Sequence, residues 1–185
     1  MDWPQNPFWD YAVELYRRPG VEGACLELQA RHGLDVNLLL LCCWLAGRGV
    51  APDAQTLGRI AAAAESWQAA FVGPLRRVRS RLKADLADPR PGSIPARWPE
   101  LASGLRGRVL ALEIDGEHLE QLLLAALAID LVPTAAPGVA LASVNLQCYW
   151  RFAASDRKPL AAVLGAAFPD VPTDEVAAAL QGLQH

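Results

Sequence analysis

The segment GLDVNLLLLCCWLAGRG, residues 33–49, decides the fold class of this chain. Its centre, Leu38 to Ala46, is an uninterrupted apolar run of the kind that forms a buried helix. Asp35 precedes the run at the position where a side-chain oxygen can accept a hydrogen bond from a free backbone N–H. Two glycines, Gly47 and Gly49, follow it. The segment therefore predicts an apolar helix with a polar cap at its start.

The composition extends this prediction to the whole chain. Of the 185 residues, 52% are hydrophobic and 20% are charged, and Ala and Leu far outnumber Val, Ile and Thr. A chain of this length can bury about 70% of its unfolded surface without disulfides or metals. We expect an all-α, single-domain helical bundle of about seven to nine helices, with almost no strand.

One long helical hairpin is expected within the bundle. Apolar residues recur at helical spacing over 75–87 and again over 99–131, and the proline-rich segment 88–95 between them predicts a non-helical connection. Gly73 and Pro74 are expected to break or kink the helix that precedes the hairpin. The apolar stripe predicted for the longer helix comprises Leu101, Leu105, Val109, Leu112, Gly116, Leu119, Leu123 and Ala126.

The chain is expected to form a helical core domain over 1–132 and a helical C-terminal extension over 133–185 that packs on the same domain. The N-terminus lacks the basic start and apolar run of a signal peptide, and the longest apolar run is less than half a membrane span. A cytoplasmic protein without a membrane partner is therefore expected. The cysteines and histidines lack the spacing of metal ligands, so we expect no metal and no cofactor.

A cluster of basic residues is the main asymmetry of charge. The chain has a net charge of −3, yet residues 76–108 contain nine basic and three acidic side chains. Antiparallel pairing of the two hairpin helices would place Arg76 near Glu113 as an ion pair and would gather positive charge near the hairpin tip. This patch is either a solvated surface or a site for phosphate, RNA or an acidic protein. Its predicted binding residues are Arg77, Arg79, Arg81, Lys83, Arg106 and Arg108.

Asp35 and Asn37 form a second candidate site. A carboxylate and an amide at a helix start can bind a ligand or assist proton transfer, but helix capping explains the same residues. No phosphate-binding glycine loop, nucleophile motif or metal-spaced His or Cys set accompanies them. The sequence therefore names no catalytic residue, although a helical enzyme can assemble its site from scattered residues.

Short motifs concentrated over residues 8–49 resemble those of a known family. They are Phe8-Trp9, Leu15-Tyr16, Pro19-Gly20-Val21, Ala24-Cys25-Leu26, Leu28-Gln29, the segment 33–40 and Trp44-Leu45. Looser similarity continues through Trp67, residues 74–76, Arg79, residues 82–83, Glu113 and Glu117. On these residues the chain resembles the uncharacterised proteobacterial family called domain of unknown function 2390. The resemblance implies a helical cytosolic protein and, through relatives encoded near ABC-F-type ATPases, a translation-linked accessory role.

The sequence supports two hypotheses about function and one hypothesis about the oligomeric state. The first is a noncatalytic interaction or adaptor protein that uses the basic hairpin tip to bind an acidic protein or RNA. The alternative is a protein that binds a small molecule or lipid ligand, or an unrecognised enzyme, with its site near Asp35 and Asn37. A homodimer is also possible, and its expected contact lies in the Ala- and Leu-rich segment 138–183.

Overall fold

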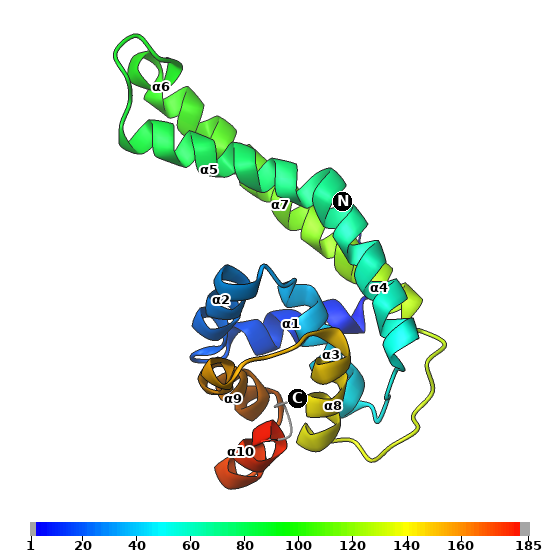
Figure 1. Cartoon of the computed structure of the whole chain (residues 1–185). Helices are drawn as coiled ribbons and strands as arrows, with labels where there is room; N and C mark the ends of the chain where they lie inside the picture. The colour runs from blue at the N-terminus through cyan, green and yellow to red at the C-terminus, as the bar shows by residue number, and fades with distance from the viewer. Residues whose placement is uncertain (1–2, 182–185) are drawn as a thin grey trace. The chain divides into compact units, whose positions relative to one another are not determined.

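The computed structural model describes residues 3–181, and every regular element within this range is a helix. The predicted all-α fold with one long helical hairpin is confirmed. The chain divides into two compact units. A core unit combines the residues up to Ala64 with those from Gln121 onward, and a hairpin unit spans Glu65–Glu120 (Figure 1).

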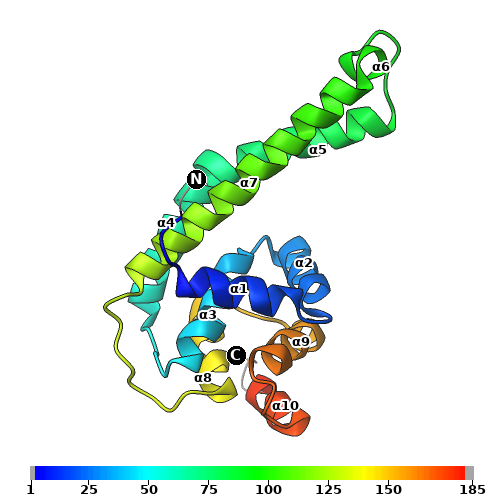
Figure 2. The ribbon, with the colours of Figure 1, turned by 180° about the vertical axis from the view of Figure 1, so that it is seen from behind.

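The core unit is built around the apolar helix predicted from residues 33–49. Its helices are α1 (Pro7–Arg17), α2 (Val21–His32), α3 (Val36–Gly47), most of α4 (Ala54–Trp67), the end of α7 (Pro99–Leu127), α8 (Val139–Tyr149), α9 (Arg157–Ala167) and α10 (Thr173–Gln181), with a short 3-10 turn, η2 (Ala154–Asp156). Side chains on all sides of α3 are buried, from Leu38 to Cys43 without a gap. Helix α3 packs against α1 and α8, while α9 packs along α2 (Figure 2).

The segment between α7 and α8, residues 128–138, is tied to the end of α3 through backbone hydrogen bonds. The carbonyl of Gly49 accepts them from the N–H groups of Thr134 at 2.9 Å and Ala135 at 3.1 Å. Gly49 has a φ of 73°, in the left-handed region that favours glycine. A Cβ atom at this position would lie 2.6 Å from the carbonyl oxygen of Ala135. Residue 49 must therefore be glycine for both conformational and steric reasons.

The hairpin unit consists of two long helical arms. The first arm leaves α4 through a π-helical turn, η1 (Gln68–Val72), and continues as α5 (Gly73–Ala87). The short helix α6 (Ile94–Arg97) follows, and α7 forms the second arm up to Glu120. The connection between the arms was expected to be wholly non-helical, but it contains helix α6. This helix can form because Ser93 caps it and Pro95 lies in its first turn, where proline is tolerated.

At Gly73 and Pro74, where a break or kink was expected, the helical path is continuous and a π-helical turn directly precedes the two residues. Proline cannot donate a backbone hydrogen bond and collides with the carbonyl one turn earlier in a regular helix. The wider turn relieves this conflict, since the N–H of Gly73 donates to the carbonyl of Gln68. A Cβ atom on Gly73 would lie 2.9 Å from that carbonyl oxygen, so the turn depends on glycine as well.

The buried side of α7 in the hairpin unit differs from the predicted apolar stripe. A row of buried positions, which we call the α7 seam, comprises Ala102, Val109, Glu113, Gly116 and Glu120, while His118 is buried outside this row. Four leucines of the predicted stripe are exposed, namely Leu101, Leu105, Leu112 and Leu119. The physical reason is that a two-helix hairpin gives each helix one neighbour and buries one narrow seam. The sequence period identified the helix correctly and included the buried Val109 and Gly116, but it also assigned four exposed leucines to the buried side.

None of the helices within residues 3–181 has both the length and the apolar character needed to cross a membrane.

Replacing Gly49 by alanine should destabilise the core unit more than the same change at Gly20. Both glycines have positive φ, but a Cβ atom on Gly20 would meet no atom within 4 Å. We expect Gly20→Ala to lower the free energy of unfolding by about 1 kcal/mol and Gly49→Ala by at least about 2 kcal/mol. Urea denaturation followed by circular dichroism measures both values. Equal losses in the two variants would show that the contact with Ala135 is unimportant.

Candidate functional site

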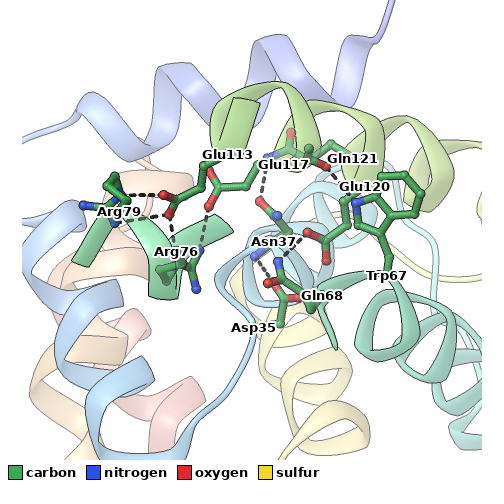
Figure 3. A network of polar contacts seen from close by, with 11 residues as sticks. Asp35, Asn37, Trp67, Gln68, Arg76, Arg79, Glu113, Glu117, Glu120 and Gln121 are labelled. Carbon is green, nitrogen blue, oxygen red and sulfur yellow. Dashed lines mark hydrogen bonds and ion pairs between the residues drawn. The ribbon is translucent and has the colours of Figure 1, made fainter. Parts of the chain in front are cut away.

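The arms of the hairpin unit are joined by ion pairs from α5 to α7 (Figure 3). Arg76 donates from Nε to Oε1 of Glu113 at 3.0 Å and from Nη2 to Oε1 of Glu117 at 2.6 Å. Arg79 donates from Nη2 to Oε1 of Glu113 at 3.2 Å and from Nε to the other carboxylate oxygen. The structure thus brings together Arg76 and Glu113, the pair expected from antiparallel packing, and adds two partners.

Two further contacts extend this set of interactions along the hairpin. The indole N–H of Trp67 donates to the carbonyl of Gly116 at 2.8 Å, and the amide of Gln68 donates to Oε2 of Glu120 at 2.6 Å. A Cβ atom on Gly116 would lie 3.3 Å from a methyl group of Val72. The two arms therefore approach closely where the π-helical turn faces α7.

Glu113 is the electrostatic centre of the hairpin unit. Only 6% of its side chain is exposed. Burial opposes ionisation of the carboxyl, but hydrogen bonds from Arg79 and Arg76 outweigh that effect and hold its pKa below the ordinary value. Arg79, which we expected in the open basic patch, is therefore engaged inside the hairpin.

Six other basic side chains between residues 76 and 108 form no ion pair within the described part of the chain. We call them the basic surface: Arg77, Lys83, Arg90, Arg97, Arg106 and Arg108. Two acidic side chains of the same stretch, Asp88 and Glu100, are also unpaired there. Arg81, another predicted member of the patch, pairs with Asp85 at 2.8 Å. The basic surface thus keeps an excess of positive charge.

Arg106 differs from the other members of the basic surface because it is partly buried. Its Nε–H group is buried and has no hydrogen-bond acceptor among the described residues. A buried donor without an acceptor is uncommon in folded proteins and costs free energy. An anionic group that reached Arg106 would supply the missing acceptor.

Asp35 and Asn37 lie in the core unit and hold helix ends together (Figure 3). Oδ1 of Asp35 accepts from the backbone N–H of Asn37 at 2.7 Å, which caps α3. The Tyr149 hydroxyl accepts from the backbone N–H of Asp35 at 2.8 Å, and Oδ1 of Asn37 accepts from the amide of Gln121 at 2.6 Å. These contacts connect the start of α3 to α8 and to the end of α7.

A buried carboxylate that the sequence analysis did not identify also lies in the core unit. Asp156 is fully buried and accepts from the N–H of Ala153 at 2.7 Å, from Nη1 of Arg31 and, at 2.8 Å, from Nε2 of His32. Burial raises its pKa, but these hydrogen bonds outweigh burial and the pKa is lowered. Arg31 and His32 lie 125 and 124 residues before Asp156 in the sequence, so no local motif indicates the cluster.

Within residues 3–181, no group of three or more His, Cys, Asp and Glu side chains is placed to hold a metal ion.

These features define an all-α protein that carries a charged helical hairpin. A family model described as protein of unknown function, DUF2390, matches residues 7–124. The match covers more than half of the chain and includes the whole hairpin unit, so the chain belongs to this family. No curated protein and no solved structure matches the chain.

The variant Glu113→Gln should weaken the hairpin in a pH-dependent manner. Loss of the carboxylate charge should lower the free energy of unfolding by about 1.5–3 kcal/mol at pH 7, because Arg76 and Arg79 lose a charged acceptor. The lowered pKa of Glu113 stabilises the folded state above the ordinary value of 4.5, and this stabilisation is lost as the pH falls through the folded pKa. The difference between wild type and variant should therefore shrink below about pH 4.5.

Denaturation with urea at a series of pH values measures this difference. Asp85→Asn is the matched control, because the pair of Asp85 with Arg81 is more exposed and should contribute less. A difference for Glu113→Gln that stayed constant from pH 7 to pH 3 would contradict the assigned ion pairs.

Proposed function

We propose that this protein is a noncatalytic adaptor that binds an acidic protein through the basic surface of its hairpin unit. The observation that carries the proposal is the set of six basic side chains without ion pairs among the described residues of a chain whose net charge is −3. Such a local excess of positive charge attracts an anionic partner and accelerates association with it.

The composition of the basic surface suits carboxylates as its target. Five of its six members are arginines, whose planar guanidinium group donates two parallel hydrogen bonds to a carboxylate. Exposed apolar side chains, Ile94 at 66% and Trp98 at 50%, lie in the same stretch. Protein interfaces commonly combine an apolar centre with arginines.

RNA is the alternative anionic partner. The same side chains would bind phosphates, and binding would then depend strongly on salt concentration. Sites for single-stranded RNA usually contain several aromatic side chains that stack on bases. Trp98 is the one Phe, Trp or Tyr residue between positions 73 and 120, and Arg97 already lies over its ring at 5.3 Å. An acidic protein therefore fits the surface better.

The site at Asp35 and Asn37 supports a ligand-binding or enzymatic function less well. Three hydrogen bonds of these residues connect elements of the core unit to one another. Capping and tertiary hydrogen bonding explain the bonded atoms of both residues, while Oδ2 of Asp35 is buried without a hydrogen-bond partner among the described residues.

Reversal of charge on the basic surface should abolish partner binding. We expect the wild-type protein to retain a partner from lysate at low salt and to lose most of it at high salt, because ionic contacts are screened. The variant Arg77→Glu/Lys83→Glu should retain at least about tenfold less partner. Quantitative pull-down with mass spectrometry measures both effects, and nuclease treatment of a second sample separates a protein partner from RNA.

The matched control is Arg157→Glu/Lys158→Glu, which makes the same change of charge at exposed positions of the core unit. This control should bind like the wild type. Equal loss of binding in both variants would show that only net charge matters, and loss of the partner after nuclease treatment would favour RNA.

A further inference from the structure

The hairpin unit exposes an ordered row of apolar side chains on α7. Leu101, Leu105, Leu112 and Leu119 are 71%, 42%, 55% and 42% exposed. Arg108 and Asp115 fill the remaining positions of this row, so that its members alternate at spacings of four and three residues. We call the six residues the α7 stripe. Its period is that of helices that pack along one another.

The first arm adds two apolar side chains to the same face. Each member of the α7 stripe directly precedes, in sequence, a residue of α7 that faces the first arm. Its side chain is therefore rotated about 100° around the helix axis from the side that faces the first arm. Phe71 and Val78 likewise lie one residue before Val72 and Arg79 on the first arm, and they are 51% and 49% exposed. Because the arms are antiparallel, this equal rotation brings both sets to one face of the hairpin.

A contiguous apolar face on two exposed helices often marks a contact with another protein. A second helical hairpin would give each helix a second neighbour and complete a four-helix bundle. A protein that binds this face must match the order of charged and apolar residues along the α7 stripe.

Read in the opposite direction, the α7 stripe brings its two residues of opposite charge close together. An antiparallel alignment centred midway between Arg108 and Leu112 places Leu101 against Leu119 of a second copy, Leu105 against Asp115, and Arg108 against Leu112. The same alignment places Arg108 about 4.5 Å along the axis from Asp115 of the second copy. Two-fold symmetry produces this opposite-charge pair twice. A parallel alignment would instead place Arg108 against Arg108.

From this arrangement we infer that the protein forms a symmetric homodimer in which two hairpin units pack through their α7 stripes. The contact differs from the one expected in residues 138–183, where α8 and α9 pack inside the core unit. Arg77 lies one residue after Arg76, which faces α7, and therefore on the opposite face of the hairpin. The dimer occupies Arg108 of the basic surface but leaves Arg77 accessible, and the inference does not depend on the proposed function.

Analytical ultracentrifugation of the full chain tests the dimer directly. We expect the wild type to sediment as a dimer at micromolar concentration and Leu112→Glu to raise the dissociation constant at least about tenfold. Ile114→Glu is the matched control, because Ile114 is 46% exposed on the same helix but lies one residue after Glu113, on the other face. This control should remain dimeric.

Charge reversal tests the antiparallel register. Arg108→Asp and Asp115→Arg should each weaken the dimer, because each change places like charges together across the contact. The double variant Arg108→Asp/Asp115→Arg should restore dimerisation. Circular dichroism checks that each variant is folded, and the charge variants keep the test decisive if Leu112→Glu does not fold.

Three results would overturn the inference. The first is a monomeric wild type, including one whose stripe binds a different protein. The second is a dimer that survives Leu112→Glu, and the third is equal dissociation by Ile114→Glu. Failure of the double charge variant to restore the dimer would overturn the antiparallel register.

Discussion

The ion pairs around Glu113 are the interaction on which the hairpin unit depends. Arg76 and Arg79 approach this carboxylate from α5, and burial strengthens the attraction between the charges. No residue of α5 is fully buried, so apolar packing alone holds the two arms weakly. Charge pairing in the seam therefore fixes which faces of the two helices meet.

This polar seam explains the unusual surface of the hairpin. Because Glu113, Gly116 and Glu120 occupy the α7 seam, the side chains one residue earlier, Leu112 and Leu119 among them, are left on an exposed face. The basic side chains of residues 76–108 that form no ion pair within the described part of the chain make up the basic surface. The same arrangement of charges thus produces both the basic surface and the exposed α7 stripe.

The core unit is organised by a different principle. Helix α3 is buried on all sides, and Asp35 and Asn37 satisfy polar groups at its start. The cluster around Asp156 fastens the end of α2 to a distant segment of the chain. These polar contacts connect helices, which is the ordinary role of buried hydrogen bonds in a helical fold.

The sequence by itself determined the helical class, the positions of most helices, the cap at Asp35 and the pairing of Arg76 with Glu113. Each follows from local periodicity, from capping chemistry or from the antiparallel geometry of a hairpin. Only the tertiary structure decided that the leucines of α7 are exposed, that Arg79 is engaged by Glu113 and that Asp156 meets His32. These outcomes depend on which neighbour each helix face finds, and helical periodicity does not contain that information.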